Sequence, residues 1–123
     1  MGYRSNVSTM ITVENKKNFK KYLKELKELK DDESMKDLID DAEFTDNGVD
    51  GIRLSWESIK WYNCLGTYPE IIAFEEWLDK IAEDEGTSYH FVRIGEDLDD
   101  VEERIEGDPK YWVYIERKLE TDF

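Results

Sequence analysis

Apolar residues recur every three or four positions in three stretches of the chain, which is the spacing of one face of an α-helix. The predicted apolar stripes are Phe19, Tyr22, Leu23, Leu26 and Leu29, then Met35, Leu38, Ile39 and Ala42, ending near Phe44, then Ile71, Phe74, Trp77, Leu78 and Ile81. Thr67 and Glu70 have the spacing of a capping box at the start of the third helix. Pro69 suits its first turn, and Gly86 suits the left-handed position that follows a helix.

Strands are predicted where β-branched and aromatic residues cluster or alternate with polar residues. The segments with this pattern are residues 7–13, 52–56, 59–62, 89–94 and 110–117. The second and third of them fit either a hairpin or one bent strand. The order of elements predicts one α+β domain over residues 1–123, with a mainly antiparallel sheet and helices packed on one face.

Two expectations about packing follow from this arrangement. The third helix should bury its stripe, including Trp77, against a sheet that contains Trp56, Phe91 and Trp112. His90, the only histidine, alternates with apolar neighbours in its strand. We therefore expect its side chain on the solvent-facing side of the sheet.

Composition and charge narrow the function classes. The 123 residues are 39% hydrophobic, enough for the core of one domain, and the formal net charge is −14. This charge repels phosphate backbones and anionic membranes, so direct binding to nucleic acid or lipid is disfavoured. One cysteine forms no internal disulfide, and we find no pattern of a membrane span or signal peptide. A reducing cytoplasm is the expected compartment.

The two signs of charge are separated along the chain. Residues 1–30 contain eight basic and three acidic residues, whereas residues 31–123 contain nine basic and 28 acidic residues. Glutamates interleave with the lysines of the first predicted helix. We therefore interpret those lysines as the solvated face of an amphipathic helix rather than a nucleic-acid contact.

The most unusual segment runs from residue 96 to residue 108, where eight carboxylates accompany one cation, Arg104. The spacing of Leu98, Val101 and Ile105 predicts a helical turn that presents these acids outward. The third helix adds a row of acids four residues apart. The candidate partner-binding residues are Asp97, Asp99, Asp100, Glu102, Glu103, Glu106, Glu75, Asp79 and Glu83.

This acidic pattern supports two interpretations. It is typical of a solvated surface that serves only solubility. Alternatively, rows of carboxylates imitate a nucleic-acid backbone and occupy the basic cleft of a nucleic-acid-binding protein. A second hypothesis is a protein-binding module anchored by the aromatic residues Trp56, Trp61, Tyr62 and Tyr68. A third, ranked below both, is a divalent-metal-dependent enzyme that uses the acids of residues 96–108.

Other candidate chemistry is weak. His90 and Cys64 have no second histidine or cysteine to complete a catalytic or metal site, and no glycine-rich phosphate loop is present. An EF-hand calcium loop is matched at four of its places, by Asp46, Asp50, Gly51 and Glu57. Its third and eighth places hold unsuitable residues, so a turn entering a strand is favoured. We predict no catalytic residue, no metal and no cofactor.

Four blocks of sequence resemble a group of small acidic proteins of tailed bacteriophages. They are Met1 to Ser5, then Ser55-Trp56-Glu57 with Ile59-Lys60-Trp61-Tyr62, then Phe91 to Asp97, then Asp99 to Glu103. The resemblance implies a phage protein that acts in the bacterial cytoplasm. Small acidic phage proteins of this kind include anti-restriction and anti-CRISPR inhibitors, which bind rather than catalyse. It therefore implies a non-enzymatic anti-defence or host-takeover inhibitor.

Overall fold

The computed structural model describes residues 3–62, 68–97, 99–115, 119–121 and 123. Three helices occur in them: α1 (Lys16–Asp31), α2 (Lys36–Asp41) and α3 (Pro69–Ile81). The strands are β1 (Ser5–Val13), β2 (Glu43–Asp46), β3 (Gly51–Ile59), β4 (Thr87–Ile94), β5 (Val101–Glu106), β6 (Val113–Ile115) and β7 (Leu119–Thr121).

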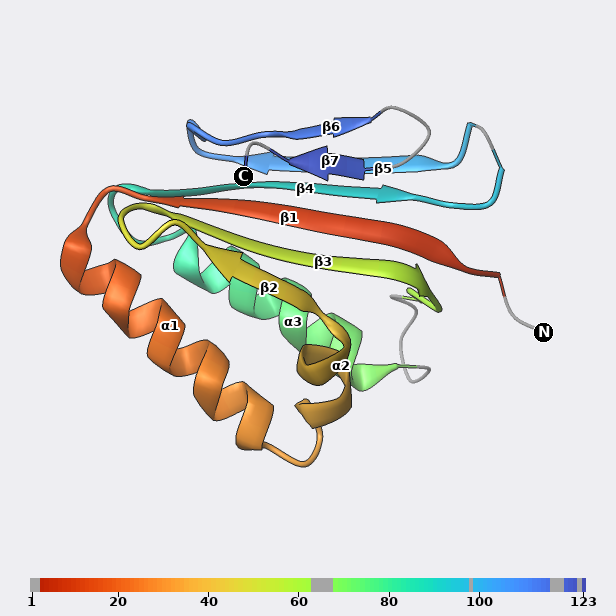
Figure 1. The fold of residues 1–123 in the computed structure, drawn as a ribbon, viewed down its shortest axis with the longest axis horizontal. Helices are drawn as coiled ribbons and strands as arrows, with labels where there is room; N and C mark the ends of the chain where they lie inside the picture. The colour runs from red at the N-terminus through yellow and green to blue at the C-terminus, as the bar shows by residue number, and fades with distance from the viewer. Residues whose placement is uncertain (1–2, 63–67, 98, 116–118, 122) are drawn as a thin grey trace.

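The first five strands form one antiparallel sheet in the order β2-β3-β1-β4-β5, and β6 pairs with β7 in a separate ladder. The three helices lie on one side of the large sheet, and the β6–β7 pair lies on the other (Figure 1). The predicted α+β class, with a mainly antiparallel sheet and helices on one face, is confirmed. The central strand β1 is the sheet's most protected element, since it pairs along its length with both β3 and β4.

The main core lies between the sheet and the helices. Alternation along each strand places every second side chain on this face. Ile52, Leu54 and Trp56 of β3 are buried there, against Phe74 and Leu78 of α3. Trp77 is only half-buried at the margin of this core, and its indole N–H donates to Glu25 Oε1 of α1 at 2.9 Å.

A second, smaller core covers the opposite face of the sheet. Met10 and Val92 point to this side and pack against Val113 and other residues of the C-terminal segment. The C-terminal segment can approach the sheet closely at Gly51 because this residue has no side chain. A Cβ there would lie 2.6 Å from the Phe123 ring.

This second core corrects two expectations. His90 faces the C-terminal segment and is 2% exposed, so its side chain is not on a solvent-facing surface. Trp112 packs edge-on against His90, with ring centroids 4.9 Å apart, and so belongs to the face opposite α3. Both errors have one cause, since a sheet that is covered on both faces has no solvated side.

Element boundaries also differ from the predictions in places. Phe44 belongs to strand β2, which sequence patterning missed. Residues 51–59 form one strand with a positive φ at Ser58, which is the single-strand alternative, and this strand ends at Ile59 rather than continuing to residue 62. Helix α3 follows Tyr68, which makes no side-chain capping bond, and Thr67 lies outside the described residues. Gly86 has a positive φ, but it lies in the connection after α3 and not directly after the helix.

The acidic segment is a strand rather than the predicted helical turn. Residues 101–106 pair with β4 from Ile94↔Val101 to Tyr89↔Glu106. Val101 and Ile105, expected to anchor the turn inward, are 46% and 45% exposed, and Leu98 lies outside the described residues. A spacing of four fits a strand as well as a helix, since positions of even spacing share one face of a strand.

Candidate partner-binding surface

The two acidic rows predicted from the sequence are brought together by Arg104. This side chain of β5 reaches across to α3, with its guanidinium 2.9 Å from Asp79 Oδ2 and 3.4 Å from Glu75 Oε1. The Tyr89 hydroxyl also donates to Asp79, at 2.6 Å. Burial, and then this hydrogen bond to a carboxylate, raise the pKa of Tyr89. Glu75 and Asp79 therefore join β5 to α3.

A second cation, Arg93 of β4, neutralises two more of the predicted acids. Its guanidinium lies 2.9 Å from Asp100 Oδ1 and 3.1 Å from Glu102 Oε1. Asp100 also accepts a hydrogen bond of 2.6 Å from the Tyr3 hydroxyl. The hydrogen bonds from Arg93 and then Tyr3 hold the pKa of Asp100 at about 2. Asp100 and Glu102 thus close the end of the β4–β5 hairpin.

Glu103 pairs with the buried histidine on the other face of the sheet. The distance from His90 Nε2 to Glu103 Oε2 is 2.6 Å. The other ring nitrogen, Nδ1, accepts the backbone N–H of Val113 at 2.9 Å. Because Nδ1 accepts, the ring proton lies on Nε2 and is donated to Glu103. The pair connects β4, β5 and the C-terminal segment.

Four predicted residues remain available for a partner. Asp97, Asp99, Glu106 and Glu83 are exposed. Within the part of the chain that the structure describes, their side chains form no hydrogen bond or ion pair. The nine candidates therefore divide into five that stabilise the fold and four that face solvent. We call Asp97, Asp99 and Glu106, which lie on or beside β5, the free acids.

The two tryptophans of the hypothetical aromatic docking patch are buried. Trp56 is 2% exposed and Trp61 is 4% exposed, and both pack in the main core. The Trp56 indole N–H donates to the Leu38 carbonyl at 2.8 Å. Tyr62 and Tyr68 are half-buried, with ring centroids 5.5 Å apart. Large aromatic side chains contribute most to stability when they are buried. These four residues therefore do not form an exposed patch.

The candidate calcium loop is a turn that enters a strand. Asp46 accepts the Gly48 N–H, and Asp50 accepts the Tyr111 hydroxyl at 2.7 Å. Glu57 lies near the far end of the nine-residue strand β3, where an EF-hand would have a helix. Within the described residues, no group of three or more histidine, cysteine, aspartate or glutamate side chains is arranged to hold a metal ion.

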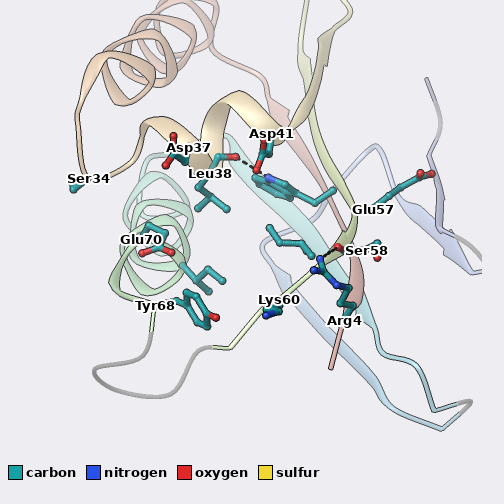
Figure 2. A pocket seen from close by; sticks show the side chains of 13 residues that line it. Arg4, Ser34, Asp37, Leu38, Asp41, Glu57, Ser58, Lys60, Tyr68 and Glu70 are labelled. Atoms are coloured by element: carbon teal, nitrogen blue, oxygen red, sulfur yellow. Dashed lines mark hydrogen bonds between the residues drawn. The ribbon is translucent and has the colours of Figure 1, made fainter. Parts of the chain in front are cut away.

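A cavity of about 620 Å³ lies elsewhere, between α2, the end of β3 and the start of α3. Figure 2 shows Asp37 and Asp41 of α2 on one side of it and Arg4 and Lys60 on the other. Arg4 is tied by a hydrogen bond of 2.7 Å to the Ser58 carbonyl. Both acidic and basic side chains line the cavity, so it does not have the uniformly negative charge of the acidic surface.

Comparison with protein-family models, curated proteins and solved structures found no match to this chain. Among the described residues, no helix has the length and apolar character needed to cross a bilayer.

Sequence reasoning missed the residues that neutralise the acids. Arg93 and His90 lie in β4, several residues away from the carboxylates they contact. Only the register between β4 and β5 brings them together. No signal in the sequence decided this, because the spacing of Val101 and Ile105 fits a helix and a strand alike.

Proposed function

We propose that this protein is a non-enzymatic inhibitor that docks through its acidic surface on a basic site of a nucleic-acid-handling or defence protein of a host bacterium. The observation that carries the proposal is the set of free acids, which are exposed and have no side-chain partner among the described residues, beside acids that pair internally. The internal pairs fix the backbone that displays the free acids. The resemblance to small acidic phage proteins supports an anti-defence role.

Electrostatics explain why these positions suit a basic target. A carboxylate that pairs with a cation of its own chain attracts an outside cation less strongly, because its charge is partly neutralised. Asp97, Asp99 and Glu106 have no such partner among the described residues, and the net charge of −14 adds long-range attraction. Such a surface speeds association with a basic cleft and disfavours acidic competitors. The same charge repels nucleic acid, so the proposed target is the protein that binds nucleic acid and not the nucleic acid itself.

The test is a triple charge reversal, Asp97→Lys, Asp99→Lys and Glu106→Lys. A pull-down from a bacterial lysate identifies the target, and its affinity is then measured for each variant by calorimetry. We expect the reversal to weaken binding by about 100-fold or more, because it places like charges face to face. Melting curves should show that the fold is retained, since exposed unpaired charges contribute little to stability.

A matched control has the same change in net charge at another site. Glu28, Asp31 and Glu33 are exposed, without side-chain partners in the described residues, and lie around the end of α1. Their reversal to lysine should change affinity only slightly, by weakening long-range attraction. Equal losses in the two triple variants would show that net charge, and not this surface, governs binding. Unchanged affinity in the β5 variant would contradict the proposal.

A further inference from the structure

Strand β5 is an edge of the large sheet, and one side of its backbone pairs with no other strand among the described residues. The Gly95 N–H donates to the Asp100 carbonyl at 2.8 Å, and hydrogen-bonded pairs alternate along an antiparallel ladder. Glu102, Arg104 and Glu106 are therefore the residues whose backbone groups bond to β4. The residues between them point their backbone groups away from the sheet.

The outward groups form a short template for another strand. The N–H groups of Glu103 and Ile105 and the carbonyls of residues 101, 103 and 105 lie on the open edge. The Val101 N–H is already used, since it donates to the Asp99 carbonyl at 3.1 Å. An open row of donors and acceptors of this kind is the feature to which extended peptides add.

The side chains along this edge determine what kind of strand fits. On the face that carries the C-terminal segment, Glu103 lies between Val101 and Ile105, which are 46% and 45% exposed. On the helix face, Glu102 and Glu106 flank Arg104, whose guanidinium is turned toward α3. An added strand would therefore meet the apolar side chains of Val101 and Ile105 on one face and the acidic side chains of Glu102 and Glu106 on the other, with the remaining free acids beside it.

We propose that β5 binds an extended segment of the target by strand addition, and that this segment alternates apolar and basic side chains. The inference rests on the proposed function and names its mode of recognition. Apolar side chains of the segment would cover Val101 and Ile105 on one face, and its cations would lie opposite Glu102 and Glu106 on the other. Cross-strand pairs of opposite charge and of apolar residues are the pairs that stabilise a sheet.

A second copy of this chain is a poor occupant of the same edge. In the antiparallel register that pairs the outward-facing residues of two copies, Glu103 lies opposite Glu103. Like charges directly opposite destabilise a ladder, and two copies that each carry −14 repel one another. The other sheet edge, β2, lies beside Lys27 and Lys30 of α1, which weaken its attraction for a basic segment.

The experiment uses the full chain and three synthetic peptides. The first alternates lysine and valine, the second alternates glutamate and valine, and the third is the lysine–valine peptide with its backbone nitrogens methylated. Methylation keeps charge and side chains but removes the N–H donors that a strand needs. We expect the lysine–valine peptide to bind best and methylation to weaken binding by at least about tenfold. Amide hydrogen exchange of Glu103 and Ile105 should slow when the peptide binds.

A variant of the protein tests the same edge from the other side. Ile105→Pro removes an outward N–H that no bond within the sheet uses, a position where an edge strand tolerates proline. The matched control Ile105→Val keeps the N–H. We expect Ile105→Pro to lose peptide affinity by about tenfold and Ile105→Val to retain it, with similar melting curves.

The outcomes separate this inference from the proposed function. Equal affinity for the methylated and unmethylated lysine–valine peptides, or unchanged exchange at Glu103 and Ile105, would overturn strand addition while leaving charge-led docking intact. No binding of the lysine–valine peptide would overturn strand addition as well. Equal binding of the lysine and glutamate peptides would count against the proposed function itself. Should Ile105→Pro fail to fold, the peptide comparison still decides.

Discussion

At the scale of single residues, acids that are neighbours in the sequence have different roles. Asp100 is held by Arg93 and Tyr3 inside the hairpin end, whereas the exposed side chain of Asp97 forms no hydrogen bond or ion pair in the described part of the chain. Composition alone treats the two as equal contributions to a net charge. A partner would meet mainly Asp97, while the fold depends on Asp100.

Asp100 should make stability depend on acid pH. Its folded pKa of about 2 is below the ordinary value of 3.8, so its contribution to stability is present above pH 3.8 and is lost as pH falls toward 2. We expect Asp100→Asn to lower the melting temperature at pH 7 and the difference from wild type to shrink between pH 4 and pH 2. Thermal melts over this pH range measure it.

Asp97→Asn is the control, because this side chain has no ion pair to lose. Its difference in melting temperature from wild type should be small at both ends of the range. An Asp100→Asn protein whose deficit is the same at pH 7 and at pH 2.5 would show that Arg93 and Tyr3 stabilise the hairpin without acting through the charge of Asp100.

At the scale of elements, α3 organises the main core through one aromatic residue. Phe74 is fully buried, with its ring centroid 5.1 Å from that of Trp56 and 6.0 Å from those of Trp61 and Trp77. Truncating it leaves a cavity that these large, rigid neighbours cannot fill. Trp77, in contrast, lies at the margin of the core.

We therefore expect Phe74→Ala to cost about 3–5 kcal/mol of the free energy of unfolding. Trp77→Ala should cost less, since its site opens to solvent and can be filled by water. Urea denaturation of the two variants gives both values. A larger loss for Trp77→Ala would mean that contact between α1 and α3, including the Glu25 bond, outweighs burial in the core.

Local patterns were sufficient for the elements that are amphipathic over many residues. Helices α1 and α3 and strands β1 and β4 were predicted close to their observed bounds, because each repeats its apolar period several times. Strand β2 has four residues, too few to show a period. For β5, a spacing of four between Val101 and Ile105 fits both helix and strand, and only pairing with β4 decides between them.

The sequence was sufficient to predict which acids belong to the candidate site, but not how they are arranged in space. The sequence identified the acids, and four of the nine are exposed without internal partners among the described residues. The other five acquire a structural role through contacts between elements far apart in the chain, such as the ion pair between Arg104 and Glu75. Such contacts depend on sheet order and on the packing of α3 over β5, neither of which a single sequence specifies.

At the scale of the whole molecule, the lysines and the free acids concentrate at different edges of the sheet. The basic helix α1 lies near β2, at one edge of the sheet, and the acidic strand β5 forms the opposite edge (Figure 1). The molecule therefore has an uneven distribution of charge in addition to its net negative charge. A basic target is attracted more strongly to the β5 edge than to the α1 side, where lysines offset the acids, so charge orients the encounter before any contact forms.

Salt should consequently have opposite effects on stability and on binding. The Debye length falls from about 30 Å at 0.01 M to about 8 Å at 0.15 M, so added salt relieves repulsion among the 31 acidic residues. Ion pairs of Arg93, which is half-buried, are screened less than exposed charges. We expect the melting temperature to rise over this range while affinity for the target falls.

The triple reversal of Asp97, Asp99 and Glu106 provides the comparison within the same fold. Its net charge is nearer to zero, so its melting temperature should be higher than that of the wild type at 0.01 M and should rise less with salt. Scanning calorimetry at the two ionic strengths measures both quantities. A wild-type melting temperature that falls with salt would mean that the internal pairs of Arg93 and Arg104 outweigh the repulsion among exposed acids. The acidic surface would then be a source of stability, and charge at β5 would need no partner to explain it.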